Sequence, residues 1–455
     1  MKKYNMDNTE DVEPAPNILK PSAEEITALI NVINQGQFEE AVVLAQSMAM
    51  RFPLQVLGWK VLGNVYNDMG KYEEALLPIK MVVILAPYDA EANSNYGLQL
   101  HHLGRLDEAE ASCRLAVKYD PNLADVHNNL GLTLLAMERL EEAEACFLKV
   151  IELNPNHPHA HNSLGVISSG LGRPYSEYFD KAIIMAPDYA DIHSNWLYYS
   201  TMLPSIDPIT LFNKHLRYAE LFETPFISEW KPHKNEKDPQ RCLKIGFVSA
   251  DLCGHALSSF IEPLLIHLSK VSTLSLYAYY NNTIKDAISL RLQSYFKSWT
   301  SVIRLNTFEL ADKIQADGID ILIDLSGHTA KNRLLTFARK PAPIQVSWMG
   351  YPGTTGLQAM DYYLADKFFL PQEPFKDQFT EKLVYLPAAA PFSPHTSAPD
   401  VNELPALNNG YITFGSFNRL NKFSPEVISV WAKLMLALPT SRLILAGMPE
   451  SGYDT

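Results

Sequence analysis

The feature that most constrains this chain is a 34-residue period in its first half. Three residue types keep one register: proline at 53, 87, 121 and 155, glycine at 63, 97, 131 and 165, and alanine at 41, 75, 109 and 143. A unit of this length cannot bury an apolar face alone and must stack on its neighbours. The period therefore predicts a solenoid of paired helices.

The unit Ala124–His157 shows why each repeat is a helix pair. Leu130 and Leu134 fall on one helical face, and Phe147 falls on a second, while Gly131 lets the two helices approach closely. Proline ends each second helix because it cannot continue one. The pattern resembles tetratricopeptide repeats. We expect four units over 23–157, a shorter fifth to 189 and a capping helix over 190–202, which places the solenoid at 20–205.

One register position of the solenoid carries asparagine three times, at Asn95, Asn129 and Asn195. In this repeat class the first helix of each unit lines the concave face. An amide both donates and accepts hydrogen bonds, so a row of asparagines can hold an extended peptide by its backbone. Alternatively, asparagine is simply common at an exposed position.

Composition and charge limit the remaining classes. The 455 residues carry a net charge of −13, which argues against a nucleic-acid partner. No cysteine pair has CxxC or zinc-ligand spacing, which suits free thiols in a reducing compartment. The polar N-terminus does not read as a signal peptide, and no apolar stretch is long enough to span a membrane. We expect a cytoplasmic protein without membrane contact.

The second half changes to an α/β pattern after a helix and a polar linker over 206–240. Apolar runs predict strands at 243–249, 274–280, 319–325 and 344–348, with helical stretches at 257–268, 284–296 and 308–317 between the first three. Alternating strands and helices indicate a parallel sheet, here a Rossmann-like lobe over 241–395. Neither a GxGxxG fingerprint nor a P-loop is present.

Histidines stand where such a sheet binds ligands. His255 follows the first strand in ADLCGHALSS, and His328 with Thr329 follows the third in LSGHT. Neutral imidazole donates to phosphates or sugar hydroxyls or acts as a base. Asp324 either orients His328 or is only a strand-end carboxylate. Glycines of the following loop, Gly350–Gly356, would let the backbone approach a ligand.

A second cationic loop follows in Gly410–Met435, read as strand, loop and helix. Ser424 is a good N-cap, and Pro425 suits the first helical turn. Lys422 beside such a helix start outlines a phosphate site, and Arg419 adds a second cation.

These stretches together resemble the O-linked N-acetylglucosamine transferase family, including its SPINDLY-type branch. The motifs are KIGFVSADLCGHALSSF, DGIDILIDLSGHT, RKPAPIQVSWMGYPGTTG, DYYLAD, LVYLP and TFGSFNRLNKFSP. The resemblance implies a GT-B arrangement, in which the nucleotide-sugar donor lies between two Rossmann-like lobes. It also implies that acceptor proteins enter along the repeats.

The resemblance assigns roles residue by residue. His255 matches the active-site histidine, His328 and Thr329 match the loop at the donor's sugar and phosphates, and Lys422 matches the lysine that neutralises the leaving diphosphate. Arg419 stands where O-GlcNAc enzymes tend to have glutamine. The donor is UDP-GlcNAc or GDP-fucose, and the reaction is an inverting transfer to Ser or Thr that requires no metal.

The second lobe begins at 396 and holds one strand, a helix and a second strand before residue 455. We therefore expect an incomplete donor pocket and weak or no activity of this chain. The alternative is a repeat-based binding scaffold with a degenerate transferase region. Repeat surfaces also allow a homodimer.

Overall fold

The computed structural model describes residues 20–238, 240–392 and 398–446. The chain forms two compact units, Met1–Pro121 and Asn122–Thr455. The first unit consists of helices α1 (Ala23–Asn34), α2 (Phe38–Arg51), α3 (Val56–Asp68), α4 (Tyr72–Leu85), α5 (Ala90–His102) and α6 (Leu106–Tyr119). The predicted period is visible in its core, where Ala41, Ala75 and Ala109 are fully buried.

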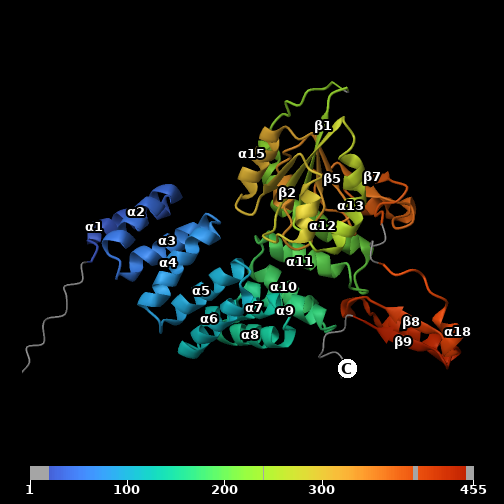
Figure 1. The fold of residues 1–455 in the computed structure, drawn as a ribbon, viewed down its shortest axis with the longest axis horizontal. Coiled ribbons are helices and arrows are strands. Elements are labelled where there is room, and N and C mark those ends of the chain that lie inside the picture. Colours follow the sequence, from blue (N-terminus) through green and yellow to red (C-terminus); the bar gives the residue numbers. More distant parts are fainter. Residues whose placement is uncertain (1–19, 239, 393–397, 447–455) are drawn as a thin grey trace, which may run out of the picture. The chain divides into compact units, whose positions relative to one another are not determined.

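The second unit begins with six more helices and a 3-10 turn. They are α7 (Ala124–Ala136), α8 (Leu140–Leu153), α9 (Pro158–Gly170), α10 (Ser176–Met185), α11 (Ala190–Ser200), α12 (Pro208–Phe222) and η1 (Thr224–Glu229). A Cβ at Gly131 would lie 2.9 Å from the Phe147 ring, so only glycine lets α7 and α8 approach this closely. The predicted helical repeats are confirmed (Figure 1).

A seven-stranded parallel sheet follows, in the order β3-β2-β1-β4-β5-β6-β7. Its strands are β1 (Leu243–Ser249), β2 (Leu274–Tyr280), β3 (Ser298–Ser301), β4 (Ile321–Asp324), β5 (Ile344–Ser347), β6 (Tyr362–Ala365) and β7 (Lys382–Tyr385). The strand order reverses between β1 and β4, and ligands bind beyond the carboxyl ends of strands at such a point. The parallel sheet expected from the sequence is confirmed.

Short helices connect these strands. They are α13 (Ala256–Leu268), α14 (Ala287–Gln293), α15 (Thr307–Asp317), α16 (Leu334–Phe337), α17 (Gln372–Phe375) and the 3-10 turn η2 (Lys376–Gln378). Compared with the expected stretches, α14 is shorter and α15 begins one residue earlier.

Each face of the sheet has its own apolar core, because successive strand residues point to opposite faces. Phe247 packs with α13 on one face. Val248 packs on the other face with Leu197 of α11 and Tyr218 of α12. The last repeat helices and the sheet therefore share one core, and α11 and α12 lie against the sheet in Figure 1.

The last described segment is a smaller β–α–β unit. It contains α18 (Pro405–Asn409), β8 (Thr413–Ser416), η3 (Leu420–Lys422), α19 (Pro425–Ala437) and β9 (Arg442–Leu445), and β8 and β9 pair in parallel. This matches the expected order of strand, loop, helix and strand. Within the described residues, no helix is long and apolar enough to cross a bilayer.

Candidate functional site

A cavity of about 590 Å³ opens beyond the carboxyl ends of β1, β4 and β5. Its walls come from the loops after these strands, from helix α11 and from the loop between β8 and α19. Five of the residues selected from the sequence line it: Asn195, His255, Thr329, Arg419 and Lys422. Segments more than 200 residues apart in the chain therefore meet at one place.

His255 is fixed by the start of α13. It is the N-cap residue, with extended backbone angles (φ −134°, ψ 155°), and its ring Nδ1 accepts the Leu257 N–H at 3.2 Å. The preceding loop is held by Gly254 N–H, which donates to Asp286 Oδ2 at 2.6 Å. Because Nδ1 is an acceptor here, the proton of the neutral ring lies on Nε2. The side chain is half exposed, so Nε2–H is available to a ligand.

His328 lies in the protein core and does not line the cavity. Its Nε2–H donates to the Thr355 carbonyl oxygen at 2.9 Å, and its Nδ1 accepts from Ser194 Oγ at 3.2 Å. Burial keeps the pKa of His328 well below its ordinary value, so the ring is neutral. The resemblance predicts that His328 contacts the nucleotide-sugar donor. In this structure both of its ring nitrogens are already hydrogen-bonded within the protein. Its neighbour Thr329 does face the cavity.

Asp324 closes the turn before His328. Its carboxylate accepts the backbone N–H groups of Ser326 (3.1 Å) and Gly327 (2.7 Å). Full burial raises the pKa of Asp324 to about 6, although these two bonds oppose the shift. Of the two alternatives drawn from the sequence, the strand-end carboxylate is the one observed. Thr355 and Ser194, rather than Asp324, bind both ring nitrogens of His328.

Lys422 and Arg419 bring positive charge to the cavity from the loop before α19. Ser424 caps this helix by accepting the Val427 N–H at 3.3 Å, as its sequence predicts. Within the described ranges, neither cation has an ion-pair partner. Burial raises the pKa of Tyr199 on α11 to about 12, and the charge of Arg419 acts against this rise, which places the guanidinium close to the repeats.

The three asparagines of the repeat register are not equivalent. Asn195 lines the cavity and donates from Nδ2 to Asn162 Oδ1 at 3.1 Å. Asn129 is buried on α7, where its exposed fraction is 7%. Asn95 is half-buried on α5 of the first unit, beside a small cleft of about 40 Å³. Asn195 is the one of the three that lines the candidate cavity.

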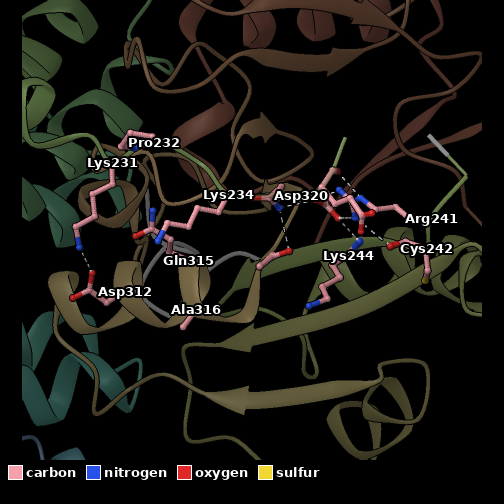
Figure 2. A pocket seen from close by; sticks show the side chains of 13 residues that line it. Lys231, Pro232, Lys234, Arg241, Cys242, Lys244, Asp312, Gln315, Ala316 and Asp320 are labelled. Carbon is pink, nitrogen blue, oxygen red and sulfur yellow. Dashed lines mark hydrogen bonds and ion pairs between the residues drawn. The ribbon is translucent and has the colours of Figure 1, made fainter. Parts of the chain in front are cut away.

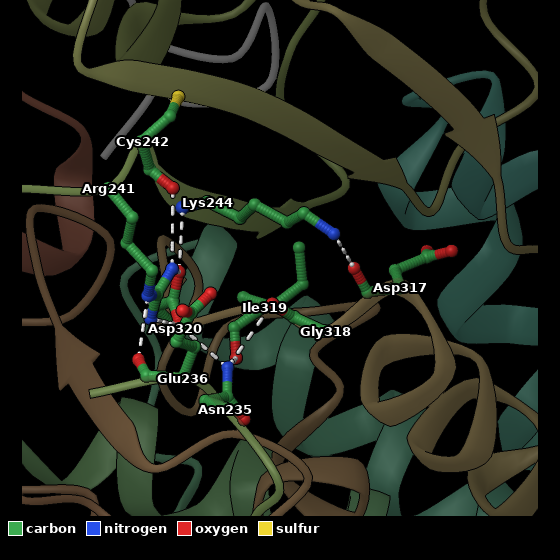
Figure 3. A network of polar contacts seen from close by, with 9 residues as sticks. All are labelled: Asn235, Glu236, Arg241, Cys242, Lys244, Asp317, Gly318, Ile319 and Asp320. Carbon is green, nitrogen blue, oxygen red and sulfur yellow. Dashed lines mark hydrogen bonds and ion pairs between the residues drawn. The ribbon is translucent and has the colours of Figure 1, made fainter. Parts of the chain in front are cut away.

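A further cavity of about 800 Å³ lies at the opposite edge of the sheet, where the linker passes the amino ends of β1 and β4 (Figure 2). Its charges are largely paired within the protein. Lys231 binds Asp312 at 2.8 Å (Figure 2). Arg241 binds Asp320, and Lys244 Nζ donates to the Asp317 carbonyl oxygen at 2.7 Å (Figure 3). We assign this network to anchoring the linker rather than to catalysis.

The acidic residue of the cavity, Asp251, was not predicted from the sequence as a site residue. Asp251 directly follows β1 and lines the cavity beside His255, with its Oδ2 3.9 Å from Nδ1 of the histidine. The only sequence signal was its position in SADLCGH, four residues before the histidine. Across the described residues, no group of three or more His, Cys, Asp or Glu side chains is arranged to hold a metal ion.

Comparisons with known proteins agree with this layout. The model of "Glycosyl transferase family 41" matches residues 221–399. Two tetratricopeptide-repeat models match residues 61–124 and 124–157.

Curated relatives include the Arabidopsis thaliana protein "Probable UDP-N-acetylglucosamine--peptide N-acetylglucosaminyltransferase SPINDLY". It is 38% identical over 245 residues, which are 52% of this chain and 26% of the relative. The Arabidopsis SEC protein of the same enzyme name is 33% identical over 231 residues, which are 49% of this chain and 23% of SEC. The matched region thus spans about a quarter of the length of these relatives.

Among solved structures, a Thermobaculum terrenum O-GlcNAc transferase variant superposes with a TM-score of 0.75 at 30% identity. The match covers 80% of this chain and 70% of that structure. A helical-repeat array fused to a parallel sheet with a cationic cavity at its carboxyl edge defines a repeat-bearing glycosyltransferase. The chain belongs to glycosyltransferase family 41.

Proposed function

We propose that this chain transfers a sugar from a nucleotide sugar to Ser or Thr hydroxyls of acceptor proteins that bind along its repeats, at the low rate expected from its sequence. The observation that carries the proposal is the shared cavity of His255, Thr329, Arg419, Lys422 and Asn195. It combines groups suited to a phosphorylated donor with a residue of the repeat array, so donor and acceptor would meet there.

Lys422 and Arg419 are the groups for the leaving diphosphate. Both are cations without an ion-pair partner in the described structure, and they precede the N-terminus of α19. A helix N-terminus favours anions, and a neighbouring lysine adds a full positive charge. As the bond from the anomeric carbon to the diphosphate breaks, Lys422 stabilises the charge that develops on the leaving oxygen.

His255 acts as a hydrogen-bond donor in this proposal. Its Nδ1 is occupied by the Leu257 N–H, so Nε2–H is the atom that faces a ligand. A positioned imidazole N–H can orient a sugar hydroxyl or a phosphate oxygen. The acceptor oxygen then attacks the anomeric carbon from the side opposite the leaving group, which inverts its configuration.

The donor follows from the relatives. Their names specify UDP-N-acetylglucosamine as donor and peptide as acceptor, which favours UDP-GlcNAc over GDP-fucose for this chain. Calorimetric titration with UDP, UDP-GlcNAc, GDP and GDP-fucose tests this directly. We expect UDP and UDP-GlcNAc to bind and GDP and GDP-fucose to fail; the reverse result would overturn the choice of donor.

Lys422→Met is the matching variant. Loss of a charge-assisted contact worth about 1.5–3 kcal/mol should weaken nucleotide binding roughly 10- to 100-fold. Lys433→Met, which changes an exposed lysine of α19, is the control and should bind as the unchanged protein does. If none of the four nucleotides binds, the transferase proposal fails and a peptide-binding scaffold remains.

A further inference from the structure

Asp251 is a largely buried carboxylate that lines the cavity. It is the one acidic side chain among the described residues that line the cavity, and 25% of it is exposed. The carboxylates of nearby Asp286 and Asp324 already accept hydrogen bonds from backbone N–H groups. In the described structure no group donates a hydrogen bond to the Asp251 carboxylate. Its oxygens therefore remain available to a ligand.

The neighbouring histidine is a poor proton acceptor in this arrangement. Nδ1 of His255 already accepts the Leu257 N–H, and Nε2 carries the ring proton. Accepting a further proton at Nδ1 would break the cap of α13, while Nε2 has no lone pair free. The 3.9 Å between Nδ1 and Asp251 Oδ2 is too long for a hydrogen bond. Proton acceptance is thus left to the carboxylate.

We propose that Asp251 is the general base of the transfer, which rests on the function proposed above. The Ser or Thr oxygen forms a bond to the anomeric carbon while its proton passes to a carboxylate oxygen of Asp251. The bond from the anomeric carbon to the diphosphate breaks, and its electron pair leaves with the nucleoside diphosphate beside Lys422. Asp251 afterwards releases the proton to solvent.

The surroundings suit this role. Burial raises the pKa of the Asp251 carboxyl, and the neighbouring His255 imidazole at the start of α13 and the Lys331 ammonium in the loop after β4 partly offset the rise. Arg419 and Lys422 face the same cavity from the loop before α19, and Asp286 lies behind Gly254. A carboxylate with a raised pKa is a stronger proton acceptor.

The test compares Asp251→Asn with the unchanged full chain and with Asp312→Asn, an exposed aspartate at the opposite edge of the sheet. Nucleotide release from UDP-GlcNAc and GDP-fucose is measured with a pool of Ser- and Thr-containing peptides, alongside calorimetric binding of UDP and GDP. We expect kcat to fall at least about 100-fold in Asp251→Asn. Nucleotide affinity should stay within about threefold, and Asp312→Asn should match the unchanged protein. The acidic limb of the pH–rate profile should disappear in Asp251→Asn.

Two results would overturn the assignment of Asp251 as the base without contradicting the proposed function. One is a kcat of Asp251→Asn within about threefold of the unchanged, active protein. The other is a nitrogen-15 NMR spectrum that places the His255 proton on Nδ1, because Nε2 would then be free to act as the base. This measurement does not require an active protein. Absence of nucleotide release by the unchanged protein would instead contradict the proposed function, and the base assignment would fall with it.

Discussion

Ser194 on the last repeat helix donates its hydroxyl hydrogen to Nδ1 of His328 in the loop after β4, at 3.2 Å. Both side chains are buried, with exposed fractions of 2% and 0%. The Tyr218 ring stacks edge-on against the same imidazole, 4.7 Å between centroids. The bond joins the repeats to the sheet directly behind Thr329, so the geometry of the cavity wall depends on the repeat array.

Ser194→Ala should destabilise the protein by about 1–3 kcal/mol, because it leaves Nδ1 of a buried histidine without its donor. Urea denaturation followed by tryptophan fluorescence measures the change. Ser269→Ala, at an exposed helix end, should stay within about 0.5 kcal/mol. If both variants unfold alike, the bond between repeat and sheet contributes nothing measurable.

The buried side chain of His215 should make the stability of the protein depend on pH. Its Nδ1–H donates to the Leu211 carbonyl oxygen and its Nε2 accepts from Tyr351 Oη, both at 2.8 Å, so the ring is neutral. Burial lowers the pKa of His215 to about 4. The unfolded chain, with a histidine pKa of about 6.5, binds more protons between these values, so this contribution to stability is lost as pH falls from 6.5 towards 4.

The comparison with His215→Gln isolates this contribution from that of Asp324, whose raised pKa acts in the opposite direction. The free energy of unfolding of the unchanged protein minus that of the variant should decrease by roughly 3 kcal/mol between pH 7 and pH 4. Urea titrations at pH 7.0, 5.5 and 4.0 measure it, with exposed His267→Gln as the control. A difference that does not vary with pH would show that His215 is not held neutral.

Sequence reasoning captured what depends on local pattern. The 34-residue period and the long apolar runs predicted the repeat helices and strands β1, β2, β4 and β5. Strand β3 was missed because Ser298–Ser301 is a short, polar edge strand that is defined only by its pairing with β2. Strands β6 and β7 were also missed, although they have four residues each, as β4 and β5 do.

The site was predictable where topology alone decides. Carboxyl ends of parallel strands meet at one edge, so His255 and His328 were expected there together. His255 lines the cavity with Thr329, the residue after His328, whereas His328 does not. Which way His328 points was not predictable. The turn at Gly327 has φ +54°, and the ring is held in the core by its bonds to Thr355 and Ser194. Such a turn is set by tertiary packing, and spacing in the sequence does not encode it.

Gly356 shows a related difference, since its loop was expected to approach a ligand. The residue has φ +79°, and a Cβ there would lie 2.3 Å from the His215 carbonyl oxygen of α12. Gly356→Ala should cost about 2–5 kcal/mol through backbone strain and overpacking. Gly353→Ala in the same loop meets only the Tyr351 ring at 3.3 Å and should cost less than about 1 kcal/mol. Thermal unfolding ranks the two variants, and an equal loss would contradict the packing described.

Asp320 and Asp312 both form ion pairs with the linker at the amino ends of the strands, and they differ in burial. Asp320 is 7% exposed and accepts hydrogen bonds from Arg241, Asn235 and Lys244 N–H. Burial would raise the pKa of Asp320, but these bonds outweigh it and hold the pKa below its ordinary value. Asp320→Ala leaves Arg241 uncompensated and should cost about 3–5 kcal/mol in the free energy of unfolding at pH 7.

Asp312 lies in the same cavity but pairs with Lys231 in solvent, with 67% and 63% of the side chains exposed. Asp312→Ala should therefore change stability by less than about 1 kcal/mol. The folded-state pKa of Asp320 is depressed, so its stabilisation is complete above the unfolded value of about 3.8 and is lost as pH falls through the folded value. Urea denaturation should thus show that the difference in the free energy of unfolding between Asp320→Ala and Asp312→Ala is smaller at pH 3 than at pH 7. A difference that is absent at pH 7 would mean that the linker is not anchored through Asp320.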